Sequence, residues 1–411
     1  MINVDLIRQN PKVVKDAINK KGGDVSVVDE FLATDKNWRE LKVKTDKLRS
    51  EQKAFGLNQR EKGAKAKKEI QINEKKISAI NLKRDALLEQ IPNLPAADVP
   101  LGKDDSENVV LREVGKKPAF KFKPKDYFSL AGKLIDTEKA GQVAGSRFSY
   151  IFGDLVLLEF ALIKLATDTL LPYGFMPVAP PVMVKPSVMK GMGKSKFLTG
   201  GDAFYINQDD LYLAGSSEHT IGPFHLNDVF GENDLPRRYV GFSACFRREA
   251  GSYGKDTKGI LRVHQFDKIE MFSFVKPEKS EDEHQFLLAR QEELLQKLKL
   301  AYQVVYICAG DMGFGDYKQF DLETWLPGQG KYRETHSCSN TTDFQARGIN
   351  AKYRVKSSQK IEFVHMLNAT AFAIGRTIIA ILENYQTADG RVRVPDVLRD
   401  YLGKEFIGDS I

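Results

Sequence analysis

The chain of 411 residues lacks both a cysteine framework and an apolar run long enough to cross a membrane. Its most apolar stretches, 155–166 and 369–382, are interrupted by charged residues, whereas a membrane helix needs about 20 mainly apolar residues. The first 23 residues contain no apolar segment of signal-peptide length and carry Asp5, unlike an acid-poor transit peptide. We therefore expect a cytoplasmic protein that does not associate with a membrane.

The chain also lacks the patterns of a zinc site and of a P-loop. Three cysteines in a chain of this length (Cys245, Cys308, Cys338) indicate reduced thiols. They form no CxxC pair and no cluster with zinc spacing, so no structural zinc is expected. The segment GMGKS at 191–195 ends like a P-loop, but Val188 stands where that pattern requires its first glycine.

The positive charge of the chain is concentrated in one segment. The formal net charge is +7, and segment 36–84 alone has sixteen Lys and Arg against six Asp and Glu. This surplus of ten leaves the other residues with a net charge of −3. A local excess of cations indicates a polyanionic partner for that segment rather than for the whole protein.

Segment 26–91 predicts an antiparallel pair of long helices. Residues suited to a helix–helix interface, most of them apolar, recur at spacings of three and four from Phe31 and again from Ile70. This spacing is a heptad pattern. GLNQREKG between them supplies a turn, so we expect an arm of roughly 40 Å at ~1.5 Å per residue. It is either a solvated hairpin or an arm that binds the phosphates of structured RNA. The candidate RNA contacts near its tip are Lys53, Arg60, Lys62, Lys65, Lys67 and Lys68.

Prolines and a glycine between residues 92 and 102 mark a linker after the arm. We expect a first domain at 1–105 and a second at 106–411. Prolines confine the strand at 174–184 to an edge or an interface. The other expected elements are helices at 153–171, 281–300 and 369–385 and strands at 303–309, 319–325 and 331–337.

The stretch 239–274 predicts a hairpin of strands at about 239–247 and 261–274, joined by a glycine-bearing loop. Residues of equal parity share one face of a strand, so Arg262, Phe266 and Glu270 are expected to point the same way. A face with arginines, an aromatic ring and a carboxylate would suit ATP bound beside an amino acid, because these ligands together present phosphates, a flat base and an ammonium group. The alternative is a solvated sheet face with ion pairs of little energetic value.

These segments together resemble the bacterial seryl-tRNA synthetase family over nearly the whole chain. The resemblance is carried by the basic arm, a PNLP linker, GFMPVAPPVMV, FRREAGSYGKDTKGILRVHQFDKIE and NATAFAIGRTIIAILENYQ. The three class II motifs follow in order: motif 1 ends at Pro181, motif 2 spans 246–270, and motif 3 contains Gly375 and Arg376. Motifs 2 and 3 indicate only class II, whereas the arm with YRETHSCSN, DFQAR and LENYQ indicates the seryl family.

The resemblance implies an α+β fold: an N-terminal antiparallel coiled-coil arm and a catalytic domain with an antiparallel sheet of six or seven strands flanked by helices. It implies a homodimer, joined partly through motif 1, that binds tRNA(Ser) across its subunits. The implied activity is that of a serine–tRNA ligase, with ATP as substrate and Mg²⁺ as cofactor. Charging of tRNA(Sec) is left open, and a catalytically silent RNA-binding paralogue or an amino acid activator for a carrier protein is the alternative.

The resemblance also implies roles for individual residues. Arg247 and Arg376 are the expected catalytic cations. The expected ATP contacts are Arg247, Arg248, Glu249, Arg262, Val263, Phe266, Glu334, Thr335, His336, Ser337 and Arg376. The expected L-serine contacts are Ser216, Ser217, Glu218, Arg247, Glu270, Asn368 and Thr370. Glu334 and Ser337 are expected to hold Mg²⁺ with ATP, and Lys255 and Lys258 to meet the acceptor end of the tRNA.

Overall fold

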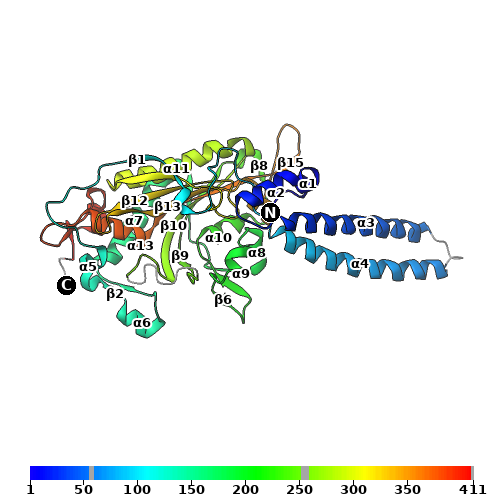
Figure 1. Cartoon of the computed structure of the whole chain (residues 1–411), viewed down its shortest axis with the longest axis horizontal. Coiled ribbons are helices and arrows are strands. Elements are labelled where there is room, and N and C mark those ends of the chain that lie inside the picture. Colours follow the sequence, from blue (N-terminus) through cyan, green and yellow to red (C-terminus); the bar gives the residue numbers. More distant parts are fainter. Residues whose placement is uncertain (55–59, 251–258, 409–411) are drawn as a thin grey trace. The chain divides into compact units, whose positions relative to one another are not determined.

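The computed structural model describes residues 1–54, 60–250 and 259–408, which form two compact units, Met1–Leu94 and Pro95–Ile411. The division follows Leu94, inside the proline-bearing linker expected from the sequence. In the described part of the chain, no helix combines the length and apolar character that a membrane span requires. The protein is α+β, with the helices and strands arranged as in Figure 1.

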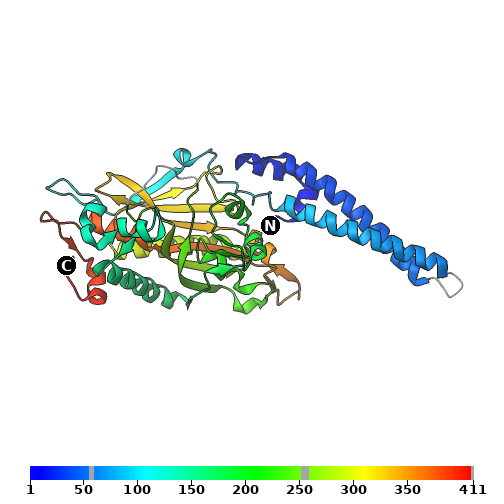
Figure 2. The same ribbon diagram turned by 90° about the horizontal axis from the view of Figure 1, so that it is seen from below.

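The N-terminal unit consists of two short helices, α1 (Val4–Gln9) and α2 (Pro11–Lys20), and two long ones, α3 (Ser26–Ala54) and α4 (Arg60–Leu88). Figures 1 and 2 show α3 and α4 side by side, which confirms the expected pair of long helices. Ion pairs link them along their length, such as Lys44–Glu69 at 2.8 Å and Arg49–Glu74 at 2.7 Å. The turn expected at GLNQREKG (56–63) was too long, because α4 already begins at Arg60 and Gly63 lies within the helix.

A buried carboxylate joins the base of the two long helices to α1. Asp35 is fully buried and accepts hydrogen bonds from Arg8 (2.8 and 2.9 Å), Arg39 (3.0 Å) and Arg84 (3.1 Å). The guanidinium of Arg84 also lies 4.4 Å from the ring centre of Trp38. An arginine is unusual at the interface between two helices. Arg84 is stable there because Asp35 pairs with its charge and the ring of Trp38 contacts its guanidinium.

The second unit is built on a mixed sheet that contains eight of the described strands. Their order is β1 (Val109–Val114), β11 (Tyr302–Tyr306), β12 (Lys318–Leu326), β13 (Lys331–Asn340), β16 (His365–Ala373), β10 (Gln265–Val275), β9 (Arg237–Phe246) and β4 (Phe175–Val178). Neighbours are antiparallel except for the pair β4–β9. The expected number of six or seven strands was thus too low. The strand β4, which contains Pro177, does lie at an edge of the sheet, as expected.

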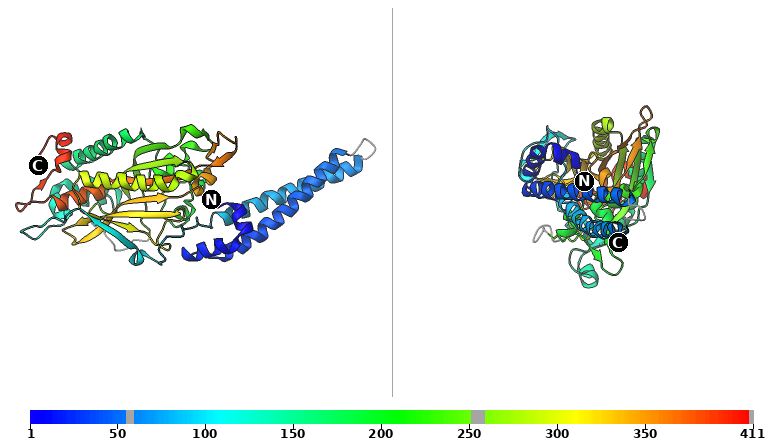
Figure 3. Two further views of the ribbon diagram at one scale, coloured as in Figure 1. Left: turned by 90° about the horizontal axis from the view of Figure 1, so that it is seen from above. Right: turned by 90° about the vertical axis from the view of Figure 1, so that its right-hand side faces the viewer.

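Three long helices cover one face of this sheet: α7 (Asp154–Leu170), α11 (Ser280–Lys297) and α13 (Ile374–Asn384). Figure 3 shows them along the same side of the strands. Gln291 of α11 fixes the helix to the sheet, because its amide donates hydrogen bonds to the backbone oxygens of Ser337 (2.8 Å) and Thr370 (2.9 Å). The apolar core lies between these helices and the strands.

Shorter elements surround the sheet. The short helices are α5 (Tyr127–Ala131), α6 (Glu138–Ala144), α8 (Pro186–Gly191), α9 (Ser195–Thr199), α10 (Glu218–Ile221), α12 (Phe344–Ile349) and α14 (Arg399–Leu402). The short strands are β2 (Ile135–Asp136), β3 (Tyr150–Ile151), β5 (Met183–Val184), β6 (Tyr205–Ile206), β7 (Leu211–Leu213), β8 (Val229–Gly231), β14 (Lys352–Arg354), β15 (Ile361–Phe363), β17 (Val392–Arg393) and β18 (Phe406–Ile407).

Two expected boundaries were wrong in ways that affect the site. The second strand of the hairpin begins at Gln265, so Arg262 precedes the strand instead of sharing its alternation. The last long helix begins at Ile374 because the residues before it form β16, a central strand of the sheet. A buried strand and a buried helix both give continuous apolar runs, so the sequence alone does not separate them.

Candidate active site

The candidate site lies on the sheet face opposite α7 and α11. On β10, Ile269 and Met271 point into the core beneath the helices. Their neighbours Lys268 and Glu270 therefore point to the other face, because side chains alternate along a strand. On the adjacent strand, Thr370 lies directly opposite Glu270, so polar residues of β10 and β16 meet on that face.

A β-bulge in β13 places further polar residues on this face. The register shifts where Glu334 pairs with Glu323 and His336 pairs with Leu322, so Thr335 is the extra residue. Glu334, Thr335 and Ser337 all line one cavity as a result. His336 points the opposite way, where its Nε2 donates to the backbone oxygen of Ala371 at 3.0 Å.

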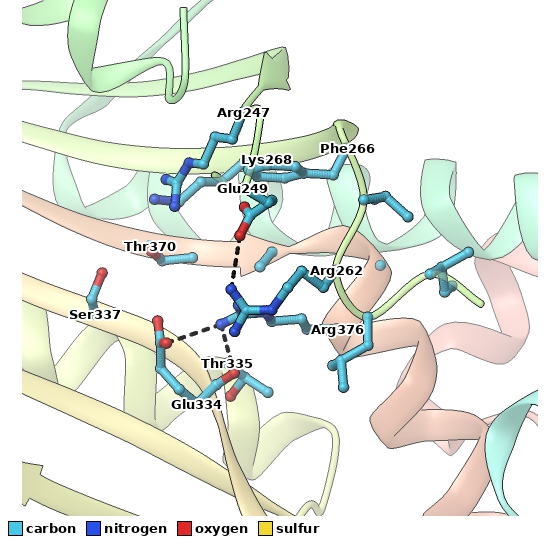
Figure 4. Close-up of a pocket in the computed structure, with 15 residues that line it drawn as sticks. Arg247, Glu249, Arg262, Phe266, Lys268, Glu334, Thr335, Ser337, Thr370 and Arg376 are labelled. Atoms are coloured by element: carbon cyan, nitrogen blue, oxygen red, sulfur yellow. Dashed lines mark hydrogen bonds and ion pairs between the residues drawn. The ribbon is translucent and has the colours of Figure 1, made fainter. Parts of the chain in front are cut away.

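A first cavity opens between β9, β10, β13 and α13. Its lining residues are Arg247, Glu249, Ile260, Leu261, Arg262, Val263, Phe266, Lys268, Glu334, Thr335, Ser337, Thr370, Ala373, Gly375 and Arg376. Figure 4 shows two ion pairs inside it, Arg262–Glu249 at 2.7 Å and Arg376–Glu334 at 3.1 Å. The guanidinium of Arg247 lies 5.3 Å from the ring centre of Phe266. The cavity thus combines a flat ring with cations suited to phosphates.

A second cavity adjoins the first, toward α9 and α10. Its lining residues are Lys194, Phe197, Asp202, Ser216, Glu218, His219, Arg247, Glu249, Lys268, Asp311, Gly313, Asp316, Gln319, Ser337, Ser339 and Asn368. Arg247, Glu249, Lys268 and Ser337 line both cavities. Arg247 and Lys268 therefore lie at the junction of the two cavities. Two anionic ligands, one in each cavity, could both contact these cations there.

Glu270 is buried beneath the point where the two cavities meet. It is 1% exposed, and its carboxylate lies 2.6 Å from Nζ of Lys268. Burial raises the pKa of Glu270 despite the nearby lysine, which acts in the opposite direction. The protonation state of Glu270 therefore depends on the balance between its burial and the charge of Lys268.

Carboxylates beside Ser337 suit a hard divalent cation. Desolvation alone would raise the pKa of Glu334, but the Arg376 guanidinium outweighs it and lowers that pKa. Asp321 lies opposite Ser337 on β12, and burial together with Glu334 raises its pKa well above the usual value. Among the described residues, no group of three or more His, Cys, Asp or Glu is arranged to hold a metal ion. Mg²⁺ prefers oxygen ligands and usually keeps several waters, so Glu334 and Ser337 would suit an ion that is also held by a bound phosphate.

The structure brings most, but not all, of the expected residues to the cavities. It places the following expected residues on a cavity wall: Ser216, Glu218, Arg247, Glu249, Arg262, Val263, Phe266, Glu334, Thr335, Ser337, Asn368, Thr370 and Arg376. It places Ser217, Arg248, Glu270 and His336 away from both walls. Arg248 donates a hydrogen bond to the backbone oxygen of Ala203 at 3.1 Å and stacks on Phe204, which turns it from the site.

The expected tRNA contacts divide between the two units. The arm residues Lys53, Arg60, Lys62, Lys65, Lys67 and Lys68 are all exposed. Lys255 and Lys258 lie outside the described residues.

Sequence reasoning missed two charged residues of the second cavity, Lys194 and Lys268, and Asp321, which pairs with Ser337 but lines neither cavity. Lys268 could have been found, because it has the same strand parity as Phe266 and Glu270. Lys194 was set aside with the incomplete P-loop pattern, and its place depends on a contact with a residue more than twenty positions later.

Comparison with known proteins agrees with this architecture. Residues 1–95 match the seryl-tRNA synthetase N-terminal domain, and residues 204–385 match the tRNA synthetase class II core domain (G, H, P, S and T). The chain is 42% identical to the serine–tRNA ligase of Thermococcus onnurineus, over 99% of this chain and 97% of the relative. It is also 42% identical to that of Acidothermus cellulolyticus, over 99% of both proteins.

The chain is also similar over its whole length to solved structures of seryl-tRNA synthetases. The seryl-tRNA synthetase of Pyrococcus horikoshii, complexed with ATP, has a TM-score of 0.92 at 39% identity and covers 99% of both chains. The cytoplasmic serine–tRNA ligase of Naegleria fowleri, in complex with AMP, has a TM-score of 0.88 at 34% identity, over 99% of this chain and 98% of that one. The chain therefore belongs to the seryl-tRNA synthetase family of class II aminoacyl-tRNA synthetases.

Proposed function

We propose that the protein is a serine–tRNA ligase that makes seryl-adenylate and then seryl-tRNA(Ser). The observation that carries this proposal is the pair of adjoining cavities that share Arg247 and Lys268, in a chain of this family. The full-length match to serine–tRNA ligases gives no support to a catalytically silent paralogue.

The first step requires no general acid or base. The carboxylate of serine is already ionised at neutral pH, and one of its oxygens attacks the α-phosphorus of ATP. The bond from that phosphorus to the bridging oxygen of pyrophosphate breaks, and pyrophosphate leaves. Arg247 and Lys268 hold the two anions together and stabilise the charge that develops between them. In the second step, the terminal ribose hydroxyl of the tRNA attacks the serine carbonyl. The ester bond forms as the bond between the carbonyl carbon and the AMP phosphate oxygen breaks, and AMP and the hydroxyl proton leave.

ATP occupies the first cavity in this proposal. Phe266 stacks on one face of the adenine ring, with Arg376 on the other face and near the γ-phosphate, and Arg262 contacts the phosphates. The complexes of the similar proteins with ATP and with AMP support a nucleotide ligand for this chain. Glu334 and Ser337 hold Mg²⁺ there, with Asp321 beside them, and the ion neutralises charge on the phosphates when bound.

Serine occupies the second cavity. Its ammonium group faces the carboxylate of Glu218, with Glu270 buried behind Lys268, and its hydroxyl points to Asn368 and to Thr370 on the adjoining wall of the first cavity. Ser216 lines the second cavity. A site that hydrogen-bonds a substrate hydroxyl rejects an analogue without it by up to about 10⁴-fold, because protein groups would be left unpaired.

The exposed lysines of the N-terminal unit bind the tRNA. They belong to an N-terminal domain at 1–105, which a catalytic domain at 106–411 follows.

The protein is of the bacterial type and acts as a homodimer in the cytoplasm, with tRNA bound across the subunits. Where the host makes tRNA(Sec), that tRNA is a further substrate. Large apolar side chains exposed on α7 and β4 support the dimer, such as Phe160 (59%) and Met176 (52%).

Charging of purified tRNA tests the whole proposal. The protein should attach radiolabelled serine to tRNA(Ser) transcripts in the presence of ATP and Mg²⁺, and should leave tRNA(Ala) uncharged. Charging of tRNA(Ser) with another amino acid, or failure to charge it while serine-dependent pyrophosphate exchange persists, would contradict it.

A further inference from the structure

Lys194 projects into the serine end of the site from the loop between α8 and α9. A backbone hydrogen bond ties this loop to α8, because the amide of Lys194 donates to the backbone oxygen of Met189 at 3.0 Å. The preceding Gly193 has φ +73°, and a Cβ there would lie 2.7 Å from the ring of Phe344. Only glycine suits this position, so the backbone directs Lys194 to the second cavity.

The ammonium group of Lys194 meets the carboxylate of Glu218. Its Nζ lies 2.9 Å from Oε1 of Glu218, and the side-chain amide of Gln345 donates to the same oxygen at 2.8 Å. The Glu218 side chain is only 9% exposed. Among the described residues, none donates a hydrogen bond to its second oxygen, Oε2, which remains available as an acceptor.

Lys194 also determines the charge of this carboxyl group. Burial alone would raise the pKa of Glu218, but Lys194, with His219 and Gln345, lowers it to about 2. Other charged groups around the pair are Arg247 on the strand side, Lys268 and Glu270 on β10, and Asp316 in the loop before β12. Of the cations, Lys194 is the one in direct contact with Glu218.

We infer that Lys194 is a positioning residue for serine: it orients the Glu218 carboxylate so that Oε2 accepts a hydrogen bond from the substrate ammonium. This inference rests on the proposed function, because it names a determinant of serine binding at the same site. Gln345 orients the same carboxylate but carries no charge, so its contribution is smaller.

The test compares Lys194→Met with Lys194→Arg, Gln345→Leu and the wild type in ATP–pyrophosphate exchange at varied serine and at varied ATP. Truncating one partner of a buried ion pair should raise the serine KM by about 30-fold or more, with the ATP KM within about threefold. Lys194→Arg should restore most of the loss, and Gln345→Leu should have a smaller effect. Lys190→Met, from the exposed side of α8, is the matched control and should behave as the wild type.

The pH profile separates positioning from simple structural support. Without Lys194, burial raises the pKa of Glu218, so kcat/KM for serine in Lys194→Met should fall as pH decreases from 8 to 6, while the wild type changes less. Stabilisation of each variant by serine in thermal unfolding gives a readout that does not require turnover.

The outcomes are distinguishable. A selective rise in serine KM, rescued by arginine and steeper with falling pH, supports the inference. A serine KM within about threefold of the wild type, or equal rises for serine and ATP, overturns it. If serine neither supports exchange nor stabilises the wild type, the proposed function fails and this inference fails with it.

Discussion

Arg376 on α13 contacts Glu334 on β13 twice: its Nη1 lies 3.1 Å from the carboxylate Oε2 and donates to the backbone oxygen at 3.0 Å. The two contacts hold the first turn of the helix against the bulged strand. They also mean that the expected metal ligand already has a cationic partner. A metal ion bound by Glu334 would therefore compete with Arg376 for this carboxylate or share it.

Glu334→Gln tests this arrangement. The amide keeps the size of the side chain but removes its charge, so exchange should fall by about 10²- to 10³-fold and half-maximal activity should need more Mg²⁺. Exchange rates at a series of Mg²⁺ concentrations measure both effects. Glu362→Gln, an exposed residue of β15, is the control, and equal losses in both variants would refute a metal role for Glu334.

Arg247 and Arg248 are neighbours with different surroundings, so they make a matched pair. Arg247→Ala should abolish serine-dependent exchange, because Arg247 lines both cavities. Arg248→Ala should retain far more exchange and lose some thermal stability, because its guanidinium packs on Phe204. Near-normal exchange in Arg247→Ala would show that the site is misplaced.

The arm should act on tRNA and not on adenylate formation. The triple substitution Lys62→Glu, Lys65→Glu and Lys68→Glu should raise the KM for tRNA(Ser) by about tenfold or more, because each lysine releases counterions from the phosphates it meets. Charging kinetics and exchange are measured on the same samples, and exchange should stay unchanged. The corresponding arginine substitutions keep the charge and should charge normally, whereas equal loss of both activities would argue against separate roles.

Asp35 should stabilise the N-terminal unit. Asp35→Asn leaves three arginines beside a neutral side chain, so the free energy of unfolding should fall by about 3 kcal/mol at neutral pH. Asp46→Asn, which breaks the exposed pair with Arg49, should cost less than about 1 kcal/mol. Denaturant unfolding measures both variants, and equal small losses would show that the buried cluster contributes little.

The pH dependence of this effect has a definite sign. Burial would raise the pKa of Asp35, but the arginines, led by Arg8, outweigh it and lower the pKa. A lowered folded-state pKa gives stability that is complete above the usual value of about 4 and is lost as the pH falls through the folded-state pKa. The difference between the wild type and Asp35→Asn should therefore shrink as the pH falls below about 4.

Periodicity was sufficient to locate the long elements of the chain. The helices expected at 153–171 and 281–300 correspond to α7 and α11, because their buried residues recur at helical spacing. It failed where tertiary pairing decides the structure. The apolar run at 369–382 contains both the end of a central strand and the start of α13.

Part of the candidate site could be predicted from local sequence patterns. Arg247, Phe266 and Arg376 were found because each is a cation or an aromatic ring within or next to a predicted strand or helix. The bulge that brings Glu334 and Ser337 to one cavity is a matter of register, which no local pattern indicates. Lys194 and Asp35 gain their roles only from partners distant in sequence, Glu218 and Arg84.

ATP–pyrophosphate exchange across the twenty amino acids is the sharpest test of serine activation, because it isolates this step from the arm and from tRNA. We expect Mg²⁺-dependent exchange with serine, and little with alanine, which lacks the hydroxyl. Exchange with glycine or alanine but not with serine would contradict it.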